Sequence, residues 1–258
     1  MVPVLLNMPG LKLYTFGIFL MLAFFWGCFM VWHTIRLSSY KEEDIFDGLF
    51  ISLGVAIFTG RLAYAALHFP DFGFSISRFI LINGYPGISL YGAIVGGVVS
   101  FALYASRRKL TVLEVYDYLV SGMFLALAIG KLGAFFSGVE VGAKTGIPLA
   151  VVYAGYEGYR HLSSLYEALF FFIGAYCGYR LLLRIRRETV KRGMGLVFFI
   201  GYFALGNLLF DPLKEPNPTI FPSLVRPVAH GVILLTMLII FGYYGGYKFF
   251  ARFGKRTQ

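Results

Sequence analysis

Charged residues are scarce in this sequence. Asp, Glu, Lys and Arg together make up 14% of the 258 residues, whereas an average soluble domain contains roughly 25%. Apolar residues, counted with Tyr, Trp and Cys, reach 58%. This balance excludes an ordinary soluble globular domain and indicates a chain that lies mostly in a lipid environment.

Cysteine is also scarce, which argues against a disulfide framework or a thiolate metal centre. The two cysteines, Cys28 and Cys177, show neither metal-ligand nor redox spacing. Both fall inside long apolar runs, where cysteine packs as a small apolar side chain. We therefore expect no metal site and no cofactor.

Long apolar runs, in contrast, are abundant. The hydrocarbon layer of a bilayer, ~30 Å thick, requires about 20 apolar residues in helical conformation. Seven runs meet this requirement: 13–35, 48–69, 87–105, 113–136, 162–183, 194–210 and 228–251. Because the connections are too short to hold a soluble domain, the sequence predicts an all-α polytopic membrane protein with seven transmembrane helices. These form a single membrane-embedded domain, 1–258.

Acidic residues are outnumbered by basic ones, 13 to 23, which gives a net charge of +10. Such a charge could indicate nucleic-acid binding, but the basic residues follow the predicted topology. The connections after the first, third and fifth runs and the tail after the seventh hold 15 Lys and Arg, whereas the opposite connections and the residues before the first run hold 6. Because basic loops stay cytoplasmic, we expect the N-terminus outside, the C-terminus in the cytoplasm, and no nucleic-acid partner.

Polar residues within the predicted helices concentrate in the outer half of the membrane. At a rise of about 1.5 Å per residue, Arg61 lies ~12 Å from the outer end of the second helix. Lys131 lies one to two turns from the outer end of the fourth helix. Other polar residues at this level are Ser89, Tyr91, Tyr166, Glu167, Asn207, Asp211 and His230.

A charge in hydrocarbon costs about 2.5 to 3.5 kcal/mol, so Arg61 and Lys131 are candidates for function. Together they predict a cationic pocket, open toward the outer leaflet, that would bind a lipid phosphate. Ser89 and Asn207 would be further polar ligands of that phosphate. The alternative is that the two long basic side chains extend to the outer headgroups and have no functional role.

Glycine is frequent, at 31 of 258 residues. The spacings Gly92-x-x-x-Gly96 and Gly174-x-x-x-Gly178 predict close packing between helices. The run 84–87 (Gly-Tyr-Pro-Gly) would break any helix, so the third span should begin from an irregular segment near membrane depth. Irregular backbone at that depth is tolerated where it lines a cavity.

Five segments form an ordered set of motifs. They are 60–64 (Gly-Arg-Leu-Ala-Tyr), 87–92 (Gly-Ile-Ser-Leu-Tyr-Gly), 130–138 (Gly-Lys-Leu-Gly-Ala-Phe-Phe-Ser-Gly), 160–167 (Arg-His-Leu-Ser-Ser-Leu-Tyr-Glu) and 211–216 (Asp-Pro-Leu-Lys-Glu-Pro). In this order and on these helices, they resemble the phosphatidylglycerol:prolipoprotein diacylglyceryl transferases of bacterial inner membranes. The resemblance covers nearly the whole chain and includes the number and orientation of the helices.

The chain departs from the family pattern at several motif positions. Tyr91 stands where the family has His, Lys131 where it has Arg, Ala134 where it has Asn, and Asn207 or Gly206 where it has Arg. Val139 stands at the position of a family acid, unless Glu140 takes that role. Lys131 keeps the charge of the family arginine but loses its two-pronged geometry.

The resemblance implies transfer of the diacylglyceryl group of phosphatidylglycerol to the lipobox cysteine thiol of a preprolipoprotein, with release of glycerol 1-phosphate. It implies a multi-pass protein of the bacterial cytoplasmic (inner) membrane whose site faces the outer leaflet. Its partners would be phosphatidylglycerol and the signal peptide with its lipobox. In this reaction the thiol must lose its proton and the leaving phosphate must be stabilised.

The resemblance also suggests catalytic roles. Lys131 would hold the phosphate together with the arginine of the second span. His161, Glu167 and Asp211 are candidate acceptors of the thiol proton, and histidine has the most suitable reference pKa. Tyr91 is a poorer acceptor, because a phenol titrates at about pH 10. His161 could instead be a loop residue that caps the fifth span.

Two other functions stay open at this point. Because the departures fall on motif residues, the chain could be a homologue that binds anionic lipid or lipoprotein signal peptides without chemistry. An intramembrane serine protease would use Ser89 with His230, both near the outer ends of their spans. A transporter would be expected to show internal repeats of its spans, and the seven runs show none.

Overall fold

The computed structural model describes residues 4–8, 11–81, 85, 87–148, 150–215, 228, 230–240 and 242. The chain divides into two compact units. Unit 1 comprises Met1–Leu37 with Leu113–Gln258, and unit 2 comprises Ser38–Val112. Each unit is described by itself, and the single domain expected from the sequence stays a prediction.

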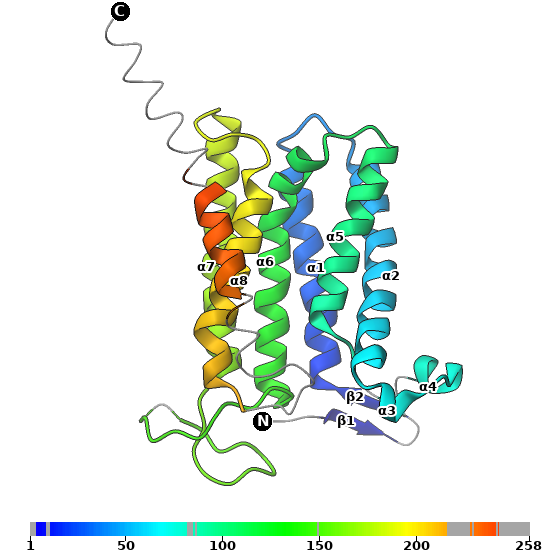
Figure 1. Ribbon diagram of the computed structural model, residues 1–258, viewed down its shortest axis with the longest axis vertical. Coiled ribbons are helices and arrows are strands. Elements are labelled where there is room, and N and C mark those ends of the chain that lie inside the picture. Colours follow the sequence, from blue (N-terminus) through cyan, green and yellow to red (C-terminus); the bar gives the residue numbers. More distant parts are fainter. Residues whose placement is uncertain are drawn as a thin grey trace, which may run out of the picture. The chain divides into compact units, whose positions relative to one another are not determined.

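Among the described residues, six helices are long and apolar enough to cross a membrane. They are α1 (Thr15–Ile35), α2 (Glu42–Leu67), α5 (Leu90–Arg107), α6 (Val112–Ser137), α7 (Ser163–Arg186) and α8 (Met194–Phe210), the last followed by the short 3-10 helix η1 (Asp211–Leu213) (Figure 1). The first six predicted spans are therefore confirmed as helices. Of the seventh, 228–251, the structure describes an apolar helix at His230–Ile240, and most of the rest lies outside the described residues.

The structure adds short elements that the all-α prediction did not contain. Strands β1 (Val4–Met8) and β2 (Leu11–Tyr14) form an antiparallel hairpin before α1. Helices α3 (Phe69–Phe72) and α4 (Ile76–Ile80) lie in the connection from α2 to α5. A span of apolar residues is visible in sequence, whereas elements of four or five residues have too few turns to show a periodicity.

Unit 2 is built on the close packing of α2 against α5, which lie side by side in Figure 1. A Cβ at Gly92 would lie 2.5 Å from Cβ of Ala63, and one at Gly96 would collide with the side chain of Thr59. The Thr59 hydroxyl donates to the carbonyl of Gly92 at 3.0 Å. The small-residue spacing is thus confirmed as a helix-packing feature.

Unit 1 has its core around α6. Phe124 of α6 lies against Phe199 and Tyr202 of α8, with ring centroids 4.9 and 5.2 Å away. Gly174 of α7 leaves room for the rings of Tyr202 and Phe124, and Gly178 lies close to Val120 of α6. The second predicted small-residue spacing therefore also serves packing.

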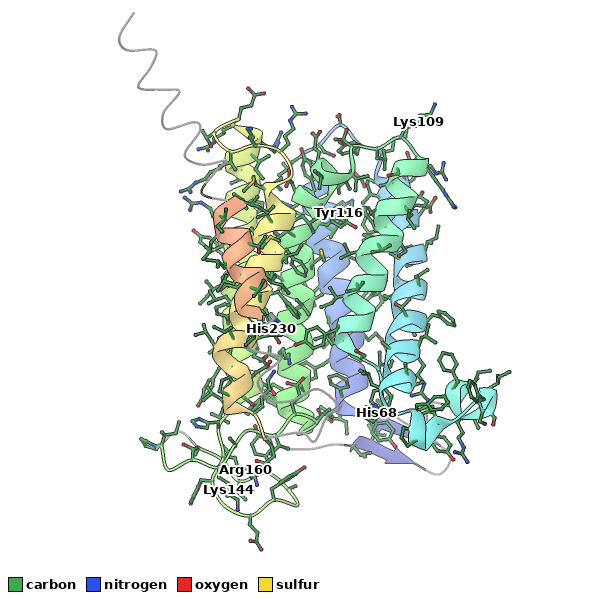
Figure 2. The ribbon with its side chains drawn as sticks, viewed as in Figure 1. His68, Lys109, Tyr116, Lys144, Arg160 and His230 are labelled. Carbon is green, nitrogen blue, oxygen red and sulfur yellow. The ribbon has the colours of Figure 1, made fainter. Side chains whose placement is uncertain are left out.

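Short antiparallel backbone pairings hold the connection between α6 and α7. Gly142 pairs with Lys214, which follows α8 and η1, and within the connection itself both Lys144 and Val151 pair with Arg160. Arg160 and Lys144 lie together in this connection (Figure 2). As a result, residues 141–143 and 213–215, which are far apart in sequence, meet at one end of unit 1.

Candidate functional site

Glu167 is the centre of a buried group of charges in unit 1. It lies in the second turn of α7 and its side chain is only 2% exposed. Its Oε2 is 2.8 Å from Nζ of Lys131 on α6, and its Oε1 is 2.7 Å from Nζ of Lys214, which follows η1. One carboxylate therefore joins three segments of the chain.

Two further carboxylates complete the group. Nζ of Lys131 lies 2.7 Å from both oxygens of Glu140, which follows the end of α6. Nζ of Lys214 lies 3.0 Å from Oδ1 of Asp211. We call these five residues, Lys131, Glu140, Glu167, Asp211 and Lys214, the carboxylate–lysine cluster. It holds three carboxylates and two ammonium groups, so it carries an excess of one negative charge.

The charges of the cluster stabilise one another. For Glu140, burial raises the pKa, but the ammonium of Lys131 and then that of Lys214 lower it, and the net result is a pKa below the ordinary value. For Lys214, burial lowers the pKa, but the carboxylates of Glu167, Glu140 and Asp211 raise it above the ordinary value. Both groups therefore stay charged at neutral pH.

Arg160 holds the loop against the segment that carries Lys214. Its side chain is 4% exposed and pairs with Oε2 of Glu215 at 2.5 Å. The same nitrogen donates to the carbonyl of Gly142 at 3.0 Å, and the guanidinium lies 4.8 Å from the ring centroid of Tyr156. The Glu215 side chain is 41% exposed, so only the guanidinium of this pair is buried. A buried guanidinium needs such additional contacts to compensate for its desolvation.

His161 lies beside this pairing. Its backbone N–H donates to the carbonyl of Ala143 at 3.0 Å, and its own carbonyl accepts the Tyr153 hydroxyl at 3.3 Å. Burial raises the pKa of Tyr153 and so keeps this donor protonated. Nδ1 of His161 is buried and has no hydrogen-bond partner within the described part of the chain. The role of His161 as proton acceptor stays a prediction.

In unit 2, Arg61 directs its guanidinium at the backbone of the connection between α2 and α5. Its Nε donates to the carbonyl of Phe79 at 2.9 Å, Nη1 to Gly87 at 2.7 Å and Nη2 to Arg78 at 2.9 Å. The residue is 3% exposed. Arg61 therefore joins α2 to α4 and to Gly87, which precedes α5. Its role as a phosphate ligand stays a prediction.

The remaining predicted residues lie at helix ends. Ser89 is the N-cap of α5, where its hydroxyl accepts the N–H of Gly92 at 3.3 Å. Tyr91 lies in the first turn of α5 and is 43% exposed. Asn207 of α8 is 7% exposed and donates to the carbonyl of Phe203 at 2.8 Å. His230 begins the short helix His230–Ile240 and is 7% exposed.

The structure thus brings together three of the predicted site residues, Lys131, Glu167 and Asp211. Sequence reasoning did not single out Lys214, and it considered Glu140 only as a possible replacement for a family acid. The available signal was the spacing of Asp211 and Lys214, three residues apart just past the end of a span, because residues at this spacing share one side of a helical turn.

The amino-acid sequence was compared with known protein families and proteins. The family model described as "Prolipoprotein diacylglyceryl transferase" matches residues 3–246. Proteins named "Phosphatidylglycerol--prolipoprotein diacylglyceryl transferase" are similar to the chain. That of Clostridium tetani is 26% identical over 219 residues, which cover 83% of this chain and 86% of the relative. That of Streptococcus suis is 24% identical over 245 residues, covering 92% and 90%. This chain belongs to the prolipoprotein diacylglyceryl transferase family.

Proposed function

We propose that this protein transfers the diacylglyceryl group of phosphatidylglycerol to the thiol of the lipobox cysteine in preprolipoproteins and releases glycerol 1-phosphate. The family match and the names of the relatives support this reaction. The observation that carries the proposal is the carboxylate–lysine cluster. Its residues come from the motif segments 130–138, 160–167 and 211–216 and from the loop between the first two.

We place the protein in the bacterial cytoplasmic membrane as a multi-pass protein, with its N-terminus outside and the cluster toward the outer leaflet. Within unit 1, the cluster lies where α6 ends and α7 begins. The opposite end of α7 carries Arg184 and Arg186 in its last turn. Because basic residues stay on the cytoplasmic side, this distribution supports an outward-facing cluster.

We infer that Lys131 is the group that meets the lipid phosphate. In the alkyl transfer, the thiol sulfur attacks the glycerol carbon, the carbon–oxygen bond to the phosphate breaks, and negative charge grows on the leaving phosphate. An ammonium held in a fixed place stabilises that charge without further reorganisation. Glu167, which is almost fully buried, keeps Lys131 in place. His161, Glu167 and Asp211 stay the candidate acceptors of the thiol proton.

The experiment is a mass-spectrometric assay of the purified protein with phosphatidylglycerol vesicles and a synthetic lipobox peptide. We expect a diacylglyceryl adduct on the peptide cysteine and an equal amount of released glycerol 1-phosphate. A matched peptide with Ser in place of the cysteine is the control and should give neither product. If no product forms although the lipid binds, the protein is a binding homologue without chemistry, and the proposed reaction is wrong.

A further inference from the structure

The ammonium of Lys131 lies between two carboxylates: it donates hydrogen bonds to Glu140 and forms an ion pair with Glu167. A lysine ammonium has three donors and no acceptor. Nζ of Lys131 lies 2.7 Å from each oxygen of Glu140 and 2.8 Å from Oε2 of Glu167. Because the Lys131 side chain is only 10% exposed and a carboxylate lies on each side of its ammonium, a phosphate gains direct access by taking the place of one of the two.

The two carboxylates are held very differently. The Glu167 side chain is 2% exposed, lies on a membrane-spanning helix, and has its other oxygen on Lys214. The Glu140 side chain is 35% exposed and lies in the connection after α6. Within the described part of the chain, Glu140 also accepts a long hydrogen bond, from the hydroxyl of Ser164 to its Oε2 at 3.3 Å. Glu140 is thus the carboxylate that can leave at the lower cost.

We propose that Glu140 is an exchangeable counter-ion of Lys131, and that the phosphate of the substrate lipid replaces it. The inference rests on the proposed function for the identity of the ligand, a phosphate ester of glycerol. The cluster already has an excess of one negative charge, so an added phosphate would be repelled unless a carboxylate moved away. Movement of Glu140 into water removes that repulsion and frees two donors of Lys131.

The exchange gives Glu140 a positioning role. Without lipid, Glu140 keeps the Lys131 ammonium paired and oriented within a largely buried site, where an unpaired charge would be costly. With lipid, its departure is a cost that the phosphate must offset. Removal of its charge should therefore strengthen phosphate binding and lower KM, whereas a carboxylate that only supports the fold would weaken binding when it is removed.

The test measures binding of glycerol 1-phosphate to the detergent-purified protein by calorimetry. We expect Glu140→Gln to lower Kd roughly tenfold relative to the wild type, because a competing negative charge is gone. Glu157→Gln is the matched control, since Glu157 is exposed in the same loop, and it should leave Kd unchanged. Lys131→Met should abolish binding. An unchanged or higher Kd in Glu140→Gln overturns the exchange.

A second variant covers the case in which Glu140→Gln does not fold. Ser164→Ala removes only the long hydrogen bond that holds Glu140 from α7. It should lower Kd in the same direction, about two- to threefold, the effect of one weak hydrogen bond. An unchanged or raised Kd counts against the exchange.

The product assay separates this inference from the proposed function. If Kd falls in Glu140→Gln while the wild type forms no diacylglyceryl adduct, the exchange is supported and the proposed reaction is wrong. If the wild type forms the adduct while Kd is unchanged in a folded Glu140→Gln, the exchange is wrong and the reaction is supported.

Discussion

Nζ of Lys131 lies 2.8 Å from Oε2 of Glu167, and this ion pair links α6 to α7 with very little access to solvent. Because Lys214 approaches the other oxygen of the same carboxylate at 2.7 Å, Glu167 separates two ammonium groups that would otherwise repel each other. Breaking a buried pair by removing one partner is strongly destabilising.

Glu167→Gln tests this central position. The change keeps the shape of the side chain but leaves Lys131 and Lys214 without their shared counter-ion. We expect the free energy of unfolding to fall by about 3–5 kcal/mol, and transferase activity to fall about 100-fold. Thermal unfolding in detergent and the product assay measure the two effects. Glu157→Gln, in the exposed part of the loop, is the control and should change neither the free energy of unfolding nor the activity. A Glu167→Gln protein with the stability and activity of the wild type would contradict the prediction.

Lys131 is tested by changing its charge and its geometry separately. Lys131→Arg should preserve or raise transferase activity, because a guanidinium keeps the charge and adds bidentate contact with phosphate. Lys131→Ala should lower kcat about 100-fold, the usual effect of removing one stabilising group from a reacting site. Lys144→Ala is the control, since Lys144 is exposed in the adjoining loop. If Lys131→Arg, Lys131→Ala and the wild type were equally active, Lys131 would have no role in the mechanism.

The cluster also predicts how stability depends on pH. The pKa of Glu140 is below its ordinary 4.5, so its contribution is complete above that value and is lost as the pH falls through the folded pKa. The pKa of Lys214 is above its ordinary 10.5, so its contribution is complete below that value and is lost as the pH rises through the folded pKa. The contribution of these two groups should therefore be constant between about pH 5 and pH 10.

Thermal unfolding of the wild type and of Glu140→Gln, followed across this pH range, checks the prediction. The difference in melting temperature between the two proteins should stay constant at neutral pH and shrink only in strong acid, where Glu140 becomes protonated in the wild type. A difference that disappears between pH 6 and pH 8 would contradict the assignment of Glu140 as a charged partner of Lys131.

For unit 1, the sequence indicated which residues are functional candidates. It did not indicate most of the contacts that these residues make. Lys131 is a candidate because a charge within an apolar run is expensive, and Glu167 because it lies at the same level and in one of the five motif segments. Lys214 is not among the candidates, because it lies just outside a span, where a charge needs no explanation. The pairing of Arg160 with Glu215 joins residues far apart in sequence, and no periodicity in either segment indicates that the two loops meet.

Arg61 is a second residue whose contacts could not be predicted from the sequence. Its depth in a predicted span indicated a charged residue with a function, and a lipid phosphate was one suitable acceptor. In the structure the guanidinium donates to three backbone carbonyls, and its role as a phosphate ligand stays a prediction. The helix-breaking run 84–87 contained a signal for the contact with Gly87, because irregular backbone near membrane depth needs donors from neighbouring side chains. Which acceptor a guanidinium selects cannot be read from its position alone.

Arg61→Lys separates these two roles. A lysine keeps the charge but cannot present the planar fork to three carbonyls at once. We expect amide hydrogen exchange in residues 78–81 and 87–88 to become about tenfold faster, equivalent to roughly 1.4 kcal/mol, one net hydrogen bond or more. Arg108→Lys is the control, because Arg108 is 54% exposed and pairs with Asp44 in the same unit. Unchanged exchange together with a raised KM for phosphatidylglycerol would favour the phosphate-ligand role.

The helix pair of unit 2 depends on the absence of a side chain at Gly92. A Cβ there would lie 2.5 Å from Cβ of Ala63 and 2.9 Å from the carbonyl oxygen of Thr59. Backbone cannot move aside as a flexible side chain can, so Gly92→Ala should destabilise the fold by about 1–3 kcal/mol. The matched control is Gly54→Ala, because a Cβ at Gly54 has no atom within 4 Å.

The control should behave in the opposite way. In the interior of a helix, alanine is favoured over glycine by about 0.8–1.0 kcal/mol, so Gly54→Ala should be neutral or raise the melting temperature. Both glycines lie on membrane-spanning helices of the same unit, and the two variants therefore differ mainly in the space around the new methyl group. If Gly92→Ala were as stable as Gly54→Ala, α2 and α5 would not be in the close contact that the structure describes.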